Sequence, residues 1–308
     1  MLNNERETLF IGIDVGNGNT KTSHVVFGSG VKEHSIMPPI TTGVVENCSG
    51  IYSVGHPKNT IPTKKLDRNM LPLIEAAVAE ELKLRGLTTA NLYLGLGVPL
   101  TRMAKDKGSL EFFFEDRKYL SFKYDGVTYN TKILGVEIYP QGYAGILNYI
   151  SNLDRLSLVI DIGSWTVDIL PLRDGRPDVS ECKSLQFGTI PCMHKINEAL
   201  RAEFDGEADE VFLKDVMITG TCNELPANYL SVIKRELYSY VEDLLGQLRA
   251  MKINLDTTQL VFIGGGATII KHFLDSKKYP KATVIDDVHI NAKGYESLIR
   301  HKYGNGGK

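Results

Sequence analysis

Cysteine is scarce in this chain of 308 residues, and its scarcity excludes two common ways of holding a small fold together. No two of the four cysteines form a C-x-x-C pair, and all are far apart in the sequence. The chain therefore has neither a disulfide framework nor the ligand spacing of a zinc knuckle. We expect buried thiols in a reducing cytosol at Cys48, Cys182, Cys192 and Cys222.

A surplus of one charge sign is also missing. The chain has 35 Lys and Arg against 37 Asp and Glu, a net charge of −2 and a pI of about 6.4. Such a chain has no overall attraction to nucleic acid or to anionic membranes, so DNA would be reached only through another protein. Residues 1–7 are polar and no long apolar run follows, which predicts a cytoplasmic protein without signal peptide or membrane span.

A familiar nucleotide motif is absent as well. No G-x-x-x-x-G-K-[ST] run occurs, which disfavours a P-loop ATPase. The length indicates about two domains. Because 43% of the residues are hydrophobic, each domain can bury a full core.

What the sequence does contain is a duplicated stretch. Residues 10–21 and 158–168 each hold an apolar, β-branched run that ends in an aspartate, then one apolar residue and a glycine. A second apolar run follows in each copy, so the pattern predicts strand, tight turn, strand. The aspartates are Asp14 and Asp161, and the glycines repeat at the same offset. One such turn is common, but two copies half a chain apart indicate a shared role.

The residue types in these turns suit a polyphosphate. Glycine can adopt φ > 0 and lets backbone N–H groups approach an anion without a side chain in the way. A carboxylate at a strand end offers hard oxygen to Mg²⁺ or to one of its waters. Two such hairpins, face to face, would hold the polyphosphate of a nucleotide from both sides.

The rest of the pattern predicts two α/β units of similar build. We expect the first over residues 1–155 and 286–308, with a small β insertion at about 100–135, and the second over 156–285. The aromatic density of the insertion would also suit a base-stacking platform, but a packed β subdomain is favoured. Local expectations include a strand over 22–27, a strand at 112–114, and a helix over 140–153 that begins at its proline.

This arrangement resembles the actin, DnaK-type chaperone and sugar-kinase superfamily, and within it the bacterial actin-like ATPases of the ParM, plasmid-segregation type. Five stretches over nearly the whole chain carry the resemblance. They are residues 14–21 and 161–168 (phosphate motifs), 140–142 and 291–295 (connecting stretches), and 264–267 (adenosine motif). The resemblance implies an α/β actin-like ATPase fold with two RNase H-like domains and a nucleotide cleft between them.

The resemblance also implies roles for single residues. Asp14 and Asp161 would organise Mg²⁺, and Lys21 would neutralise phosphate oxygens, although it also fits an exposed strand lysine. Gln141 would place the attacking water; it also fits a helix-capping residue, and a glutamine is a poor base, so hydrolysis should be slow. The catalytic set is then Gln141, Asp161 and Asp14. The nucleotide-binding set is Asn17, Gly18, Asn19, Thr20, Lys21, Gly163, Ser164, Trp165, Gly264, Gly265, Gly266 and Ala267. Trp165 departs from the family pattern, which often has a small or polar residue there.

The function implied is an actin-like ATPase that polymerises into nucleotide-dependent polar filaments for plasmid segregation, with hydrolysis of ATP to ADP controlling disassembly. GTP stays open as an alternative nucleotide. The partners implied are other copies of the chain and a DNA-binding adaptor of the ParR type, with no direct contact to nucleic acid or membrane. Head-to-tail stacking is a heterologous contact that does not close and so gives a filament.

Two other classes compete with this interpretation. The sequence around Asp14 also resembles type III pantothenate kinases, so a small-molecule kinase of the sugar or pantothenate type is the main alternative. The CxCGxxGC cluster of zinc-bearing sugar kinases is absent, and Gln141 favours hydrolysis over transfer. A chaperone-like or membrane-scaffold relative is the third class, but the chain is too short for a chaperone's substrate domain and residues 303–308 form no amphipathic tail.

Overall fold

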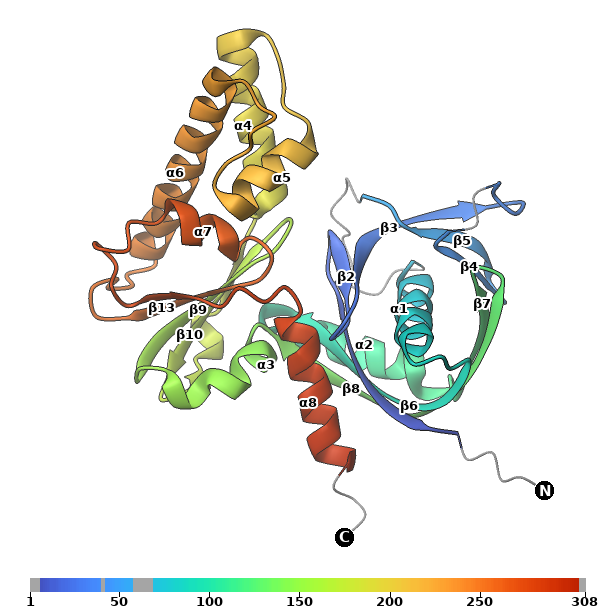
Figure 1. Ribbon diagram of the computed structural model, residues 1–308. Coiled ribbons are helices and arrows are strands. Elements are labelled where there is room, and N and C mark those ends of the chain that lie inside the picture. Colours follow the sequence, from blue (N-terminus) through green and yellow to red (C-terminus); the bar gives the residue numbers. More distant parts are fainter. Residues whose placement is uncertain (1–5, 40–41, 58–68, 305–308) are drawn as a thin grey trace, which may run out of the picture. The chain divides into compact units, whose positions relative to one another are not determined.

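The computed structural model describes residues 6–39, 42–57 and 69–304. The chain divides into two compact units, drawn as ribbons in Figure 1. Unit 1 comprises Met1–Asn148 and His289–Lys308, and unit 2 comprises Tyr149–Val288. No helix in the described ranges is long and apolar enough to cross a membrane.

The sheet of unit 1 closes into a barrel with the strand order β1-β2-β3-β5-β4-β7-β8-β6. Strand β1 is antiparallel to β2 and parallel to β6, and β6 is parallel to β8. The strands are β1 (Thr8–Val15), β2 (Asn19–Lys21), β3 (Val26–His34), β4 (Val44–Asn47), β5 (Gly50–Gly55), β6 (Thr89–Pro99), β7 (Tyr119–Tyr124) and β8 (Val127–Gln141).

Helix α1 (Met70–Leu84) lies inside this barrel, as Figure 1 shows, and contacts β1 to β5 and β7. Eleven of its fifteen residues are buried. A helix enclosed on all sides must be apolar all round, which explains why its sequence lacks a polar face. Two carboxylates, Glu75 and Glu81, are nevertheless enclosed with it.

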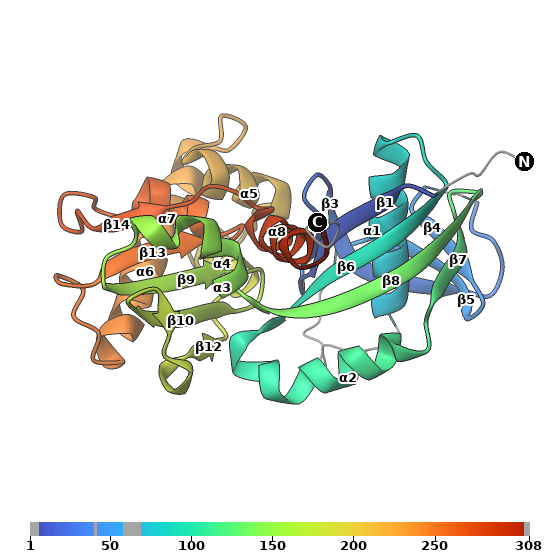
Figure 2. The same ribbon diagram turned by 90° about the horizontal axis from the view of Figure 1, so that it is seen from below.

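Three further helices pack on this sheet or on one another. The 3₁₀ turn η1 (Leu100–Arg102) leads into α2 (Met103–Glu115), which lies along β8 and β6 in Figure 2. Helices α3 (Tyr143–Ile146) and α8 (Ile290–Gly304) pack together, and α8 lies on β1 and β6. The close packing of α8 on β1 requires glycine at position 12, because a Cβ on Gly12 would lie 1.9 Å from the carbonyl oxygen of Ala292. The 3₁₀ helix η2 (Leu147–Asn152) follows α3.

Unit 2 has a sheet in the order β11-β10-β9-β13-β14, and β12 also pairs with β10. Its strands are β9 (Leu156–Ile162), β10 (Val167–Arg173), β11 (Arg176–Pro177), β12 (Lys183–Leu185), β13 (Gln259–Ile263) and β14 (Ala282–Val284), and its helical elements are η3 (Val179–Glu181), α4 (Thr189–Phe204), α5 (Glu210–Thr219), α6 (Ala227–Ala250) and α7 (Ala267–Phe273). Helix α6 buries one stripe, including Ile233, Leu237, Leu244 and Leu248, against a core shared with α4, α5 and α7. Its periodic apolar pattern made this helix predictable.

The two units share one strand order. Unit 1 contains the run β3-β2-β1-β6-β8, and unit 2 contains β12-β10-β9-β13-β14. In both runs the first two pairings are antiparallel and the last two are parallel. The middle strand of each run, β1 or β9, carries the aspartate of a predicted phosphate motif. The duplication in the sequence is therefore a duplication of topology.

The prediction of a strand at residues 112–114 is wrong, because these residues lie in α2. Leu110 and Phe114 are buried four residues apart on one face of this helix, whereas Phe112 is 75% exposed. A short apolar run is compatible with either structure, and here the spacing of its flanking residues decides. The insertion is thus a helix followed by the β7–β8 hairpin.

The predictions for residues 22–27 and 140–153 are also wrong in part. The second strand ends at Lys21, and Thr22 begins a turn. Strand β8 continues past a bulge at Leu134 through Pro140 to Gln141, so no helix begins at the proline. A proline fits there because the ladder between β7 and β8 ends near Ile133, so beyond this point the described residues form no ladder on that edge of β8.

The cysteines are free thiols, but they are not all buried as expected. Cys192 and Cys222 are buried, Cys182 is half-buried and Cys48 is exposed. Burial raises the pKa of the Cys192 thiol to about 12, so this residue acts as a small apolar side chain of the core.

Candidate functional site

The first predicted phosphate motif forms the tight β1–β2 hairpin. Asp14 pairs with Lys21 and Val15 with Thr20 across it. The Gly16 N–H donates to the carbonyl oxygens of Asp14 and Asn19, both at 3.1 Å. A Cβ on Gly16 would lie 2.7 Å from the Asn19 oxygen, so the turn closes only around glycine.

The Asp14 carboxylate is enclosed at the end of β1, with 1% of the residue exposed. Its Oδ2 lies 3.8 Å from the Lys21 ammonium. Its Oδ1 is buried and has no hydrogen-bond partner within the described residues. A buried carboxylate oxygen without a partner is rare in folded proteins and calls for an ion, a water or a ligand. Asp14 and Lys21 thus place an anionic and a cationic group side by side at a glycine turn.

The other polar residues of this hairpin have separate surroundings. Thr20 is fully buried, and its hydroxyl lies 2.9 Å from that of Ser29, so its side chain serves the hairpin itself. Asn19 pairs with Gly28 in the ladder to β3, and Asn17 and Gly18 form the turn.

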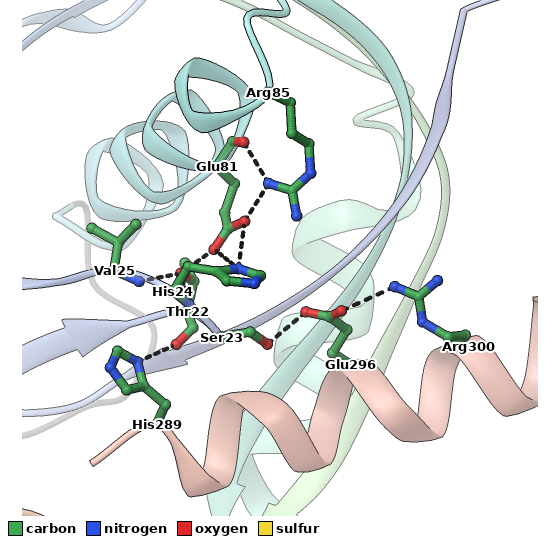
Figure 3. Close-up of polar contacts among 9 residues, drawn as sticks. All are labelled: Thr22, Ser23, His24, Val25, Glu81, Arg85, His289, Glu296 and Arg300. Atoms are coloured by element: carbon green, nitrogen blue, oxygen red, sulfur yellow. Dashed lines mark hydrogen bonds and ion pairs between the residues drawn. The ribbon is translucent and has the colours of Figure 1, made fainter. Parts of the chain in front are cut away.

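Immediately after Lys21 the chain is held by the enclosed helix α1 (Figure 3). The Thr22 hydroxyl donates to the Glu81 carboxylate, His24 Nδ1 lies 3.1 Å from it, and Arg85 donates to it at 2.5 Å. The Thr22 oxygen in turn accepts from the backbone N–H groups of His24 and Val25, at 3.2 and 3.0 Å. Burial alone would raise the pKa of Glu81, but the hydrogen bonds from Thr22, Arg85 and His24 outweigh it and hold the pKa below 4.5.

Helix α8 holds the same turn from a second side (Figure 3). The Ser23 hydroxyl donates to Glu296 at 2.5 Å, and Arg300 donates to the other oxygen of Glu296 at 3.0 Å. His289 Nδ1 lies 2.8 Å from the Thr22 carbonyl oxygen. The sequence gives no signal for these contacts, because the partners are far apart in the chain. The residues that follow Lys21 are therefore fixed by two helices.

Gln141 lies at the same edge of the unit 1 sheet as Asp14. It pairs with Pro99 at the end of β8, and the parallel register aligns Ile13 with Leu96 and Leu96 with Ile138. Asp14 and Gln141 therefore lie near the ends of their strands at the same edge of the sheet. The two strands are separated by β6, so the distance between them is roughly 10 Å at ordinary strand spacing.

The second predicted phosphate motif forms the β9–β10 hairpin of unit 2. Asp161 is buried and pairs with Asp168 on β10 and with Ile263 on β13. The Gly163 N–H donates to the Thr166 carbonyl oxygen at 2.9 Å and so serves the turn. The start of α4 closes on this turn, since the Ile190 N–H donates to the Ser164 carbonyl oxygen at 2.8 Å.

The predicted adenosine motif lies directly beside this hairpin. Gly264 follows β13 with φ +86°, and a Cβ there would lie 2.3 Å from Asp161 Oδ1. The Gly266 N–H donates to the Ile162 carbonyl oxygen at 2.9 Å, and Ala267 begins α7. At Gly265, by contrast, an added Cβ would meet nothing within 4 Å.

Trp165 occupies the turn between β9 and β10. Its indole Nε1 is buried and has no hydrogen-bond partner in the described ranges. Its ring lies edge-on to that of His194 at 6.4 Å between centroids. The predicted site residues thus form two groups, one at Asp14 in unit 1 and one at Asp161 in unit 2.

These residues fit a magnesium ion that keeps most of its water. The described ranges contain no group of three or more His, Cys, Asp or Glu side chains that could hold a metal alone. Mg²⁺ instead binds through one or two carboxylates, several waters and substrate phosphates. The unpartnered Oδ1 of Asp14 is the kind of hard oxygen that such a hydrated ion takes up.

Comparison with known proteins identifies the fold. No protein-family model and no curated protein sequence matches the chain. Among solved structures, an Alp12 filament is 18% identical with a TM-score of 0.70, covering 96% of this chain and 99% of that one. The archaeal actin homolog Ta0583 gives 20% identity and a TM-score of 0.74 over 96% and 99% of the two chains. Bacillus thuringiensis ParM with ATP gives 14% and 0.68 over 97% and 100%.

The chain has the actin-like fold. The predicted α/β actin-like architecture is confirmed, and so is the structural resemblance to ParM-type proteins. At these identities the likeness concerns the fold. The strand order that the two units share places β1 of unit 1 and β9 of unit 2 at corresponding positions.

Proposed function

We propose that this chain is an actin-like ATPase that binds ATP through both of its duplicated hairpins and assembles into filaments in a nucleotide-dependent way. The observation that carries the proposal is the enclosed Asp14 carboxylate at a glycine turn. The Lys21 ammonium lies beside it, and one of its oxygens has no hydrogen-bond partner in the part of the chain that the structure describes. The neighbours support it, since one is a filament structure and others contain ADP, ATP or AMPPNP.

In unit 1 the proposed work is charge neutralisation and positioning. Asp14 would hold hydrated Mg²⁺, which when bound neutralises phosphate charge. Lys21 exchanges its long contact with Asp14 for phosphate oxygens, and the turn at Asn17, Gly18 and Asn19 supplies backbone N–H groups. Phosphoryl transfer requires little else, because its catalysis is mainly positioning and electrostatic stabilisation.

In unit 2 the second hairpin and the glycine turn act together. Asp161 is the second carboxylate for the metal ion, and Ser164 and Trp165 bind phosphate through the turn. Gly264, Gly265, Gly266 and Ala267 let the nucleoside approach backbone at the start of α7. The close contact between Gly264, which has no side chain, and Asp161 supports this assignment, because any side chain at position 264 would displace the carboxylate.

Gln141 is the proposed residue that orients the attacking water. Its carboxamide can accept from the water and donate to a phosphate oxygen but cannot remove a proton efficiently, so hydrolysis is slow. Slow hydrolysis suits a timer for filament disassembly. ATP is the proposed nucleotide, in line with the nucleotides bound by the structural neighbours.

For the biological role we propose plasmid segregation in the cytoplasm. Polar filaments of this chain would move DNA through a DNA-binding adaptor of the ParR type. The net charge of −2 supports contact with DNA through an adaptor rather than through the chain itself. The similarity to ParM structures is the other support.

The test combines phosphate release and sedimentation of the purified chain with Mg²⁺ and ATP, with ADP, or without nucleotide. Wild type should release phosphate slowly and form large species with ATP. Asp14→Asn and Asp161→Asn should lower kcat/KM for ATP by roughly 100-fold. Asp174→Asn is the matched control, because Asp174 lies in an exposed Asp-Gly hairpin turn of unit 2, where it forms an ion pair with Arg155. Absence of both phosphate release and ATP-dependent assembly at every magnesium and salt concentration would refute the proposal.

A further inference from the structure

The backbone turns sharply directly after Gln141. Gly142 has φ +77° and ψ −56°, a conformation that glycine adopts without strain, and α3 begins at the next residue. Gln141 itself is the last residue of β8. The direction of its side chain therefore depends on how firmly the Gly142 peptide is held.

One side chain from a distant part of the sequence holds that peptide. The Gly142 N–H donates to Oδ1 of Asn291 at 2.9 Å, in a buried hydrogen bond that spans 149 residues. Asn291 lies on α8 and is 4% exposed. A buried N–H that lost this acceptor would be left unsatisfied, so the turn has a reason to keep the bond.

The packing around Asn291 leaves its side chain little freedom. A Cβ on Gly145 would lie 2.8 Å from Asn291 Oδ1, and a Cβ on Gly294 would lie 2.3 Å from the Ala144 carbonyl oxygen. Helices α3 and α8 are thus in backbone contact on both sides of the bond. A carboxamide held this closely transmits the position of α8 directly to the Gly142 peptide.

We propose that Asn291 is a positioning residue for Gln141: through the Gly142 N–H it fixes the carboxamide of Gln141 where it orients the attacking water. The inference rests on the proposed ATPase function. It gives the connecting stretch of α8 an indirect part in catalysis, which requires no contact between Asn291 and the nucleotide. Displacing a water-orienting group by about 1 Å can cost up to about 100-fold in rate, so one buried hydrogen bond is enough to matter.

The experiment is a double-mutant cycle on the steady-state kcat of phosphate release from Mg-ATP. It uses the full-length chain with Asn291→Ala, Gln141→Ala and both changes together. We expect each single change to lower kcat by about 10-fold or more with little change in KM. Since both act through one group, the double variant should match Gln141→Ala within about twofold. Asn291→Asp keeps the acceptor for Gly142 and should restore most of kcat.

Tyr303→Phe is the matched control. Tyr303 also ties α8 to β8, through a hydrogen bond to Glu137, but at the other end of the helix. Its loss should lower the melting temperature and leave kcat unchanged. A melting curve for every variant separates loss of fold from loss of positioning.

The outcomes separate the two proposals. If wild type releases no phosphate, the ATPase function fails and this inference fails with it. If Gln141→Ala is slow but Asn291→Ala is not, or if their effects multiply in the double variant, the ATPase function stands and the role of Asn291 is refuted. If Asn291→Asp is as slow as Asn291→Ala while both fold, the Gly142 hydrogen bond is not the means of positioning.

Discussion

Replacing Thr22 by valine should destabilise unit 1 strongly although it changes the shape of the side chain little. The hydroxyl donates to the buried Glu81 carboxylate and accepts from two backbone N–H groups, and the residue has no exposed surface (Figure 3). A hydrogen bond to a charged group contributes about 1.5–3 kcal/mol and a neutral one about 0.5–1.5. We therefore expect a loss of about 3 kcal/mol or more.

The assay is differential scanning calorimetry of wild type, Thr22→Val and Thr22→Ser. In a unit of this size, each kcal/mol shifts the melting temperature by about 2–4 °C, so the valine variant should melt about 6–12 °C lower. Serine keeps the hydroxyl and loses only a methyl group, so it should melt within a few degrees of wild type. If valine and serine melt together, the hydroxyl does not stabilise the turn and the reasoning is wrong.

The same substitution has a pH signature. The pKa of Glu81 is lowered in the folded chain, so its contribution to stability is complete above pH 4.5 and is lost as the pH falls through the lower folded value. Without the Thr22 hydroxyl the folded pKa should rise. On titration towards acid, the melting temperature of Thr22→Val should therefore fall less than that of wild type, because its folded and unfolded pKa values lie closer together.

Three further outcomes can be checked. Burial raises the pKa of Glu75 to about 7 in the folded chain, against 4.5 unfolded, so the fold loses stability as the pH rises between these two values. The melting temperature of Glu75→Gln, measured relative to wild type, should therefore be higher at pH 8 than at pH 5. Parallel curves of melting temperature against pH for the two proteins would contradict this. Trp165 is the sole tryptophan, so Mg-ATP should change the protein's tryptophan fluorescence; an unchanged spectrum at a concentration that saturates phosphate release would remove Trp165 from the site. Gly264→Ala should abolish ATP binding in a calorimetric titration, because its Cβ would meet the Asp161 carboxylate. Gly246→Ala on α6, where an added Cβ meets nothing within 4 Å, should bind normally; equal affinities would show that the glycine turn is not used.

The duplicated hairpins and the fold class could be predicted because their signals are local. An apolar run, an aspartate and a glycine turn are all read within a dozen residues, and the second copy confirms the first. The long amphipathic α6 is predictable for the same reason. Helix α2 was missed because Phe112, Phe113 and Phe114 have no periodicity of their own.

Contacts that depend on tertiary structure had no signal in the sequence. The barrel closes through the pairing of β1 with β6, and the sequence of neither strand predicts that the barrel will enclose α1. Thr22 and Glu81 are 59 residues apart, and Gly142 and Asn291 are 149 apart. None of these residues stands out from its neighbours in the sequence. Each gains its role only when the helices pack.

Helix α8 has a consequence for the order of events during synthesis. It is part of unit 1, yet it follows the whole of unit 2 in the chain. Until it is made, the bare glycine surface of β1 and β6 that receives Tyr295 and Ala292 stays uncovered, while every strand of unit 2 is already available. Synthesis therefore completes unit 2 before unit 1. Nascent chains stopped near Val288 should contain a protease-sensitive unit 1 and a protease-resistant unit 2.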